Sequence, residues 1–233
     1  MALASPKRSL AERAGFFLFL TLVLSAVFSF VRICAPQPFF DGADAYAPVR
    51  SNYVLMFIQC VLGLLVLSLP SIVSRKWQFT IPNFIYIMYY VFLYCAIFLG
   101  EVLNFYYIIP HWDVILHFFS GAMLGALGFI LVSQLNDSEM VHISLTPFFV
   151  ALFSFCFALC CGAAWEIYEF IFDGLLGLNM QKFMLASGEI LTGHAALQDT
   201  MTDLIVDALA ALVISLIGYS RLKAQTWFHH ASK

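Results

Sequence analysis

The stretch from Asp113 to Ser133 reads DVILHFFSGAMLGALGFILVS, an almost unbroken apolar run. A helix needs about 20 mostly apolar residues to cross the hydrocarbon core of a bilayer. The only ionisable residues of the run are Asp113 and His117, which lie near one of its ends. We therefore predict a transmembrane helix that carries two polar groups close to one membrane surface.

The composition of the whole chain agrees with this interpretation. Of the 233 residues, 62% are hydrophobic and 11% are charged. Soluble domains carry about 25% charged residues. A soluble fold must cover itself with polar groups, so it could not hide this much apolar surface. The excess faces lipid, and we expect no nucleic-acid partner.

Five further apolar runs have a similar length. We predict an all-α polytopic membrane protein in which residues 1–233 form a single bundle of six transmembrane helices, approximately 15–33, 53–73, 83–104, 113–133, 147–172 and 199–219. The first run is longer than the core of a signal peptide and lacks a small-residue cleavage site. We expect it to be retained.

Acidic residues are concentrated in the last four spans. Eight of the fourteen acids lie within or at the ends of spans: Glu101, Asp113, Glu166, Glu169, Asp173, Asp199, Asp203 and Asp207. Because consecutive helices cross in opposite directions, all eight fall toward the same membrane surface. An ionisable group at the bilayer centre costs at least about 2.5–3.5 kcal/mol, so such residues usually face the bundle interior and mark function.

The helical phases of these acids point to one shared site. At 100° per residue, Asp199, Asp203 and Asp207 fall within an arc of about 80°, and Asp113 and His117 within about 40°. Small residues in the same helices, such as Gly121 and Gly162, would allow close helix approach. We predict that the polar side chains line one cavity.

The charge of this cluster needs compensation. The one Lys or Arg between Trp77 and Ser220 is Lys182, which falls in the connection before the last span. We therefore expect no salt bridge to reach these acids. Three explanations remain open, namely a bound metal cation, protonated carboxyls or a water-filled cavity.

An oxygen-rich set with one histidine suits Mg²⁺, Mn²⁺, Ca²⁺ or non-haem iron better than Zn²⁺. The predicted ligands are Asp113, His117, Glu166, Glu169, Asp203 and Asp207. We expect His117 or Glu169 to act as the general base. Further candidate polar residues of the site are Glu101, Asn104, Asp173, Asp199 and His194.

Three motifs make the chain similar to a known family. They are Trp112-Asp113-Val-Ile-Leu-His117-Phe-Phe-Ser120-Gly121, Trp165-Glu166-Ile-Tyr-Glu169-Phe and Asp199-Thr-Met-Thr-Asp203-Leu-Ile-Val-Asp207. Together they resemble the YjdF-like family of predicted bacterial inner-membrane proteins, which implies a topology and site residues but no reaction. The order of His, Glu and Asp is more distantly similar to VanZ-like membrane proteins, in which Glu-x-x-Gln and Asp-x-x-x-Asn would be expected.

The distribution of Lys and Arg predicts the orientation. With both termini in the cytoplasm, eight of the eleven basic residues lie inside, and Arg32, Arg50 and Lys182 lie outside. The acidic cluster then belongs to the outer leaflet of a bacterial inner membrane.

Two main classes of function fit this placement. One is a metal-dependent enzyme acting on a lipid or lipid-linked substrate, and the other is a cation- or proton-coupled transporter. Beyond Asp207 the last span has no Asp, Glu, His, Lys or Arg before Arg221, which favours a site over a conduit. A structural membrane protein is a third alternative. The sequence has no Gly-rich nucleotide fingerprint, so we expect no nucleotide cofactor.

The orientation can be tested with reporter fusions at the C-terminus. We expect a cytoplasmic reporter to be active and a periplasmic reporter to be silent, because the basic residues are concentrated on one side. The opposite pattern would move the acidic cluster to the inner leaflet.

Overall fold

The computed structural model describes residues 9–35, 50–78, 80–136, 145–185 and 188–231. Over this part of the chain the structure is almost entirely helical, and the one β-type pairing is an isolated bridge between Met184 and Ile190. Six helices are long and apolar enough to cross a membrane, in the ranges Leu10–Cys34, Tyr53–Trp77, Asn83–Val102, Trp112–Leu135, Pro147–Leu176 and His194–Gln225. The all-α fold with six candidate spans is therefore confirmed.

The chain divides into two compact units, one up to Pro110 and one from His111 onward. We predicted a single six-helix domain, which stays a prediction, and each unit is described by itself.

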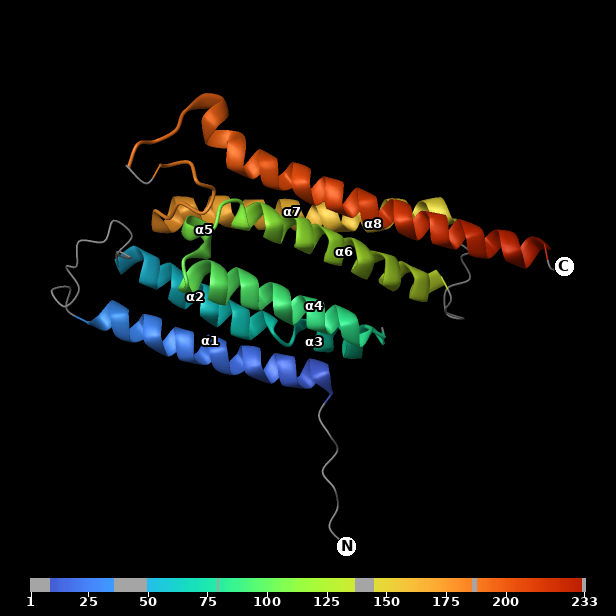
Figure 1. Cartoon of the computed structure of the whole chain (residues 1–233), viewed down its shortest axis with the longest axis horizontal. Coiled ribbons are helices and arrows are strands. Elements are labelled where there is room, and N and C mark those ends of the chain that lie inside the picture. Colours follow the sequence, from blue (N-terminus) through green and yellow to red (C-terminus); the bar gives the residue numbers. More distant parts are fainter. Residues whose placement is uncertain (1–8, 36–49, 79, 137–144, 186–187, 232–233) are drawn as a thin grey trace, which may run out of the picture. The chain divides into compact units, whose positions relative to one another are not determined.

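The first unit contains α1 (Leu10–Cys34), α2 (Arg50–Val66), α3 (Leu69–Trp77), α4 (Asn83–Leu93), a π-helix (Tyr94–Val102) and α5 (Phe105–Ile108) (Figure 1). Helix α1 begins with a capping box, in which Ser9 accepts from the Glu12 amide and Glu12 accepts from the Ser9 amide. The core of the unit is apolar and includes Leu18, Leu22 and Cys60.

The second unit consists of α6 (Trp112–Asn136), α7 (Pro147–Leu176), a short 3₁₀ helix (Gly193–Leu197) and α8 (Gln198–Ala231). The three long helices contact one another pairwise (Figure 1). Helix α7 begins after Thr146, whose hydroxyl accepts from the Phe149 amide, and ends at Gly177, whose φ of 63° is left-handed.

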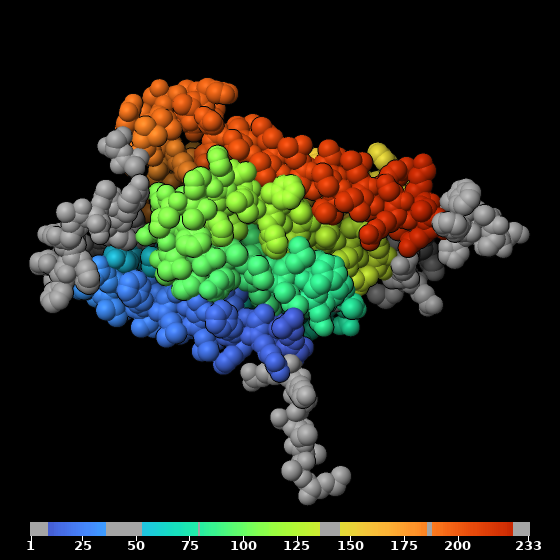
Figure 2. All heavy atoms as spheres, viewed as in Figure 1, coloured from blue at the N-terminus to red at the C-terminus, as the bar shows by residue number. Residues whose placement is uncertain are grey.

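The segment from Gly177 to Leu197, here called the 177–197 connection, joins α7 to α8. In the space-filling view its described residues gather at the end of this unit where α8 begins (Figure 2). Because α6 begins, α7 ends and α8 begins at this end, the acids of all three helices lie near it.

Glycines bring the three helices into close contact around one residue of α8. A Cβ atom at Gly121 would lie 3.0 Å from the backbone oxygen of Asp207, and one at Gly162 would lie 2.2 Å from its Oδ2. A larger residue at either position would collide with Asp207, so the small side chains set the helix spacing there.

We expect Gly162→Ala to destabilise the protein by about 1–3 kcal/mol, because the added methyl displaces a buried carboxylate. The matched control is Gly174→Ala on the same helix, where a Cβ meets nothing within 4 Å. That change should be neutral or stabilise by up to about 1 kcal/mol through helix propensity. Thermal unfolding in detergent measures both, and equal effects of the two variants would contradict the packing described.

Candidate metal centre

His117 lies at the centre of the polar group. It sits in the second turn of α6, where only 5% of the residue is exposed. Its Nδ1 lies 3.1 Å from Oδ2 of Asp207 on α8. With Nδ1 protonated, this contact is a hydrogen bond from the imidazole to the carboxylate, and Nε2 then carries the free lone pair.

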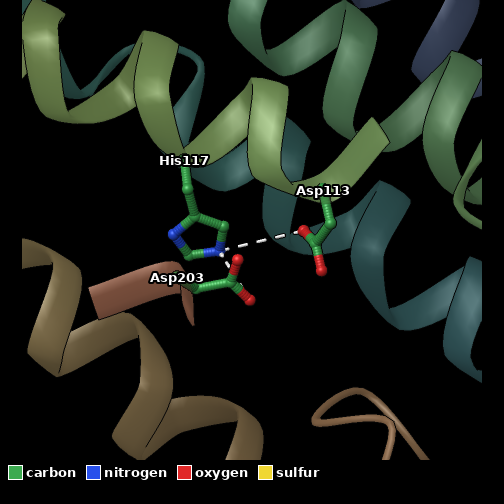
Figure 3. A group of neighbouring side chains, drawn as sticks. All are labelled: Asp113, His117 and Asp203. Carbon is green, nitrogen blue, oxygen red and sulfur yellow. Dashed lines mark ion pairs between the residues drawn. The ribbon is translucent and has the colours of Figure 1, made fainter. Parts of the chain in front are cut away.

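Nε2 of His117 faces three carboxylates that come from three different helices. It lies 3.8 Å from Asp113 Oδ1, 3.7 Å from Glu166 Oε1 and 3.8 Å from Asp203 Oδ2. Figure 3 shows the side chains of Asp113, His117 and Asp203 directed toward one another. These distances exceed the usual hydrogen-bond range, so a small group between the side chains could bridge them.

The carboxylates of this group are buried, and several of their oxygens lack a hydrogen-bond partner. Asp203 and Asp207 are 1% exposed, and Glu166 is 4% exposed. Within the described residues, no hydrogen-bond partner is found for either oxygen of Glu166, for Oδ1 of Asp203 or for Oδ1 of Asp207. A buried polar atom without a partner is costly, so these oxygens call for a ligand, a proton or water.

Three side chains offer ligand atoms close enough for one ion. One atom each from Asp113, His117 and Asp203 lie within 4.8 Å of one another. Glu166 approaches the same Nε2 atom from α7. The structure thus brings together five of the six predicted ligands, with Asp207 on the far side of the imidazole ring.

Lys182 corrects one expectation drawn from the sequence. We predicted that no basic side chain reaches the acids, and this is wrong. The Nζ atom of Lys182 donates to Asp113 Oδ2 and, at 2.8 Å, to Asp199 Oδ1. Burial lowers the pKa of Lys182, but the carboxylates of Asp113 and Asp199 outweigh it and raise that pKa above its ordinary value. The ammonium is therefore charged and neutralises part of the cluster.

Asp173 holds the connection that carries this lysine. Its carboxylate accepts from the backbone amides of Met180, at 2.7 Å, and Gln181, at 3.0 Å. The Gln181 side chain donates to Thr200 at the start of α8. These bonds fold the connection back over the helix ends, which is why Lys182 reaches the acids. Asp173, a predicted site residue, acts here as an anchor.

Glu169 lies on the same face of α7 as Glu166 and is 6% exposed. Its Oε1 accepts from the indole N–H of Trp165 at 2.9 Å. No partner is found for its Oε2 among the residues that the structure describes. Glu169 is thus oriented through one oxygen, with the other available.

The remaining predicted residues are placed elsewhere. Glu101 and Asn104 belong to the first unit, where Glu101 lies in the π-helix and Asn104 has a left-handed φ of 59°. His194 is exposed on the 3₁₀ helix. Asp199 lies at the edge of the cluster, where it holds Lys182.

Sequence reasoning missed the roles of Lys182, Trp165 and Gln181. Lys182 was noticed as the one basic residue between Trp77 and Ser220, but its place in a connection gave no sign that its side chain reaches the acids. The contacts of Trp165 and Gln181 carry no comparable signal.

We expect Asp173→Asn to loosen the 177–197 connection, because an amide replaces the charged acceptor of two backbone bonds. Hydrogen bonds to charged groups contribute about 1.5–3 kcal/mol. Hydrogen exchange at the Met180 and Gln181 amides should accelerate accordingly. The exposed Glu189, changed to Gln, serves as the control. Unchanged protection of both amides in the Asp173 variant would show that the carboxylate is not the anchor.

Comparisons with known proteins are consistent with this architecture. A protein from Thermotoga maritima, described as uncharacterized, is 31% identical over 134 residues, which make up 56% of this chain and 58% of that protein. The match therefore spans little more than half of that relative. No solved structure matches the chain. The model of a family described as predicted membrane protein (DUF2238) matches residues 16–224. The chain therefore belongs to this family of predicted membrane proteins.

Proposed function

We propose that the second unit binds one divalent cation through His117, Asp113 and Asp203, and that the bound ion serves a reaction on a lipid or lipid-linked substrate. The proposed location is the outer leaflet of a bacterial inner membrane. The observation that carries the proposal is the surroundings of His117, with one ring nitrogen on Asp207 and the other facing three carboxylates.

The two nitrogens of His117 fit the arrangement of a metal-bound histidine. Such a histidine usually donates its second N–H to a carboxylate, which fixes the tautomer and the orientation of the ring. Asp207 is placed to do this at 3.1 Å from Nδ1. In the proposal Asp207 therefore orients the ligand, although the sequence had suggested that Asp207 is itself a ligand.

The spacing of the facing atoms also supports one ion. Two ligands at about 2.1 Å from an ion and about 90–110° apart lie about 3.0–3.5 Å from each other. The Nε2 to oxygen distances of 3.7 and 3.8 Å are slightly longer, as expected for ligands that close in when the ion binds.

The charge balance favours a cation over a purely structural role. Asp113, Glu166, Asp203 and Asp207 all contact His117, and the one basic side chain shown near them is Lys182. Carboxylates this close cannot all remain ionised without compensation. Oxygen donors with one imidazole suit Mg²⁺, Mn²⁺, Ca²⁺ or Fe²⁺ better than Zn²⁺.

The depth of the site supports a substrate that resides in the membrane. His117 lies five residues after the start of α6, which corresponds to about 8 Å along the helix. The hydrocarbon core is about 30 Å thick, so this depth is close to the headgroups. A divalent ion there would polarise a phosphoryl or carbonyl oxygen or activate water. Glu169, with one oxygen held by Trp165, is the candidate general base.

Transport of a cation or proton is the second candidate, favoured by the buried carboxylates themselves. A conduit also needs polar groups toward the other surface. After His117 in α6 and between Asp207 and Arg221 in α8 there is no Asp, Glu, His, Lys or Arg, and α7 has none of these before Glu166. A site reached from one side therefore accounts better for the layout.

The proposal is tested by thermal unfolding in detergent, with chelator or with Mg²⁺, Mn²⁺, Ca²⁺ or Zn²⁺, together with metal analysis of the purified protein. An ion that binds only the folded state stabilises it by about 2.7 kcal/mol at one hundred times its dissociation constant. We expect Asp203→Asn to abolish the shift and the control Glu189→Gln to retain it. Since ligands must be deprotonated, the shift should weaken as the pH falls.

If no ion raises the midpoint and none is found in the protein, protonated carboxyls explain the cluster, and the transport or structural alternatives gain. The substrate class is tested separately. Incubation of the metal-loaded protein with membrane lipids should change a lipid species detectable by mass spectrometry, and Asp203→Asn should not.

A further inference from the structure

Asp113 uses its two oxygens in two directions. Its Oδ1 faces Nε2 of His117 at 3.8 Å, and its Oδ2 accepts from the ammonium of Lys182. The same ammonium donates to Asp199 Oδ1 at 2.8 Å. A single carboxylate therefore joins the proposed cation position to a second position that the lysine occupies.

We propose that the ammonium of Lys182 takes the place of a second divalent cation and thereby restricts the centre to a single ion. This inference rests on the proposed function, because it assumes an ion at His117. When the charge of Lys182 is removed, the same carboxylates bind a second divalent cation between Asp113 and Asp199.

The arrangement of donors matches that of a two-cation centre. In such centres the ions lie about 3.5–4 Å apart, and carboxylates contribute oxygens to them. Asp113 is placed to bridge in this way. Asp199 supplies the next donors, since its Oδ1 holds the lysine and no partner is found for its buried Oδ2 among the described residues.

A separate observation shows that Lys182 does not satisfy the cluster. Glu166 is 4% exposed, and no hydrogen-bond partner is found for either of its oxygens in the described part of the chain. Its Oε1 points toward His117 Nε2 at 3.7 Å. Carboxylate oxygens that can bind a divalent ion therefore remain while Lys182 is in place. Lys182 reduces the number of such oxygens, because it occupies one oxygen each of Asp113 and Asp199.

The position of Lys182 is fixed by the backbone around it. The preceding residue, Gln181, is held through its amide by Asp173 and through its side chain by Thr200. Lys182 itself has a left-handed φ of 48°. A tethered ammonium carries one positive charge and cannot exchange with ions in solution, so it occupies its position at every metal concentration.

The experiment counts the ions bound to the full-length protein in detergent. After chelation and removal of the chelator, Mn²⁺ binding is measured by equilibrium dialysis and by electron paramagnetic resonance. We expect one Mn²⁺ per wild-type chain. We expect Lys182→Met to bind two, with a spin-coupled spectrum because the ions are neighbours.

Three controls accompany this variant. Lys223→Met removes a lysine from α8, at a position outside the cluster, and should leave one ion per chain. Lys182→Arg keeps the charge and should also bind one. The double variant Lys182→Met, Asp199→Asn loses a donor of the second position and should return to one ion.

The outcomes separate the two proposals. A wild type that binds no ion overturns both. A wild type that binds one ion, beside a Lys182→Met variant that also binds one, overturns the inference on the lysine alone. If Lys182→Met is recovered only when Mn²⁺ is present during purification, two bound ions per chain support the inference and one bound ion overturns it. If Lys182→Met fails to fold even with Mn²⁺, Lys182 is required for the fold itself and the inference is wrong.

Discussion

The contact between His117 and Asp207 is the interaction on which the rest of the second unit depends. It joins α6 to α8 through two residues that are 5% and 1% exposed. Asp207 also sits against Gly121 and Gly162, where a Cβ atom would lie within 3.0 and 2.2 Å of it. The approach of three helices is thus set around one carboxylate. Because that carboxylate also orients the imidazole, helix packing and site geometry cannot change independently, and a change in the spacing of the helices would rotate the ring away from Asp113, Glu166 and Asp203.

The 177–197 connection also contributes to the cluster, although it is not a membrane span. A lysine placed on a transmembrane helix near the cluster would itself require burial of a charge. Here the lysine comes from a connection that Asp173 fastens through two backbone amides, so its backbone lies outside the spans while its ammonium reaches Asp113 and Asp199. The position of Lys182 therefore depends on Asp173. The Asp173 carboxylate fixes the backbone of the connection, and this backbone places the Lys182 ammonium beside Asp113 and Asp199.

The sequence predicted the helices and much of the convergence, because both follow from local periodicity. A helix repeats every 3.6 residues, so the spacing of Asp203 and Asp207 already places them on one face, and the alternation of spans places that face at the same end as Asp113 and His117. The path of a connection has no such periodicity. The reach of Lys182 depends on backbone bonds to Asp173 and on the contact between Gln181 and Thr200, which are set by tertiary structure. The contact of Glu169 with Trp165 spans one helical turn and was open to prediction, but indole N–H groups find many different partners, so the spacing alone does not select it.

The incomplete neutralisation of the cluster is what separates a candidate cation site from a structural ion-pair network. In a structural network, each buried charge is matched, because an unmatched one costs several kcal/mol. Around His117 the positive charges do not match all of the buried carboxylates. Lys182 contacts Asp113 and Asp199, while Glu166, Asp203 and Asp207 keep oxygens for which the described residues provide no partner. If stability alone had shaped this region, apolar residues of similar size would serve at these positions at lower cost. The retained carboxylates lie toward one end of three helices whose middle turns carry no charged side chain, so the negative charge is concentrated around the imidazole. In the proposed site, the excess of negative charge would be the source of the affinity for a cation, and the lysine would determine how much of that excess remains.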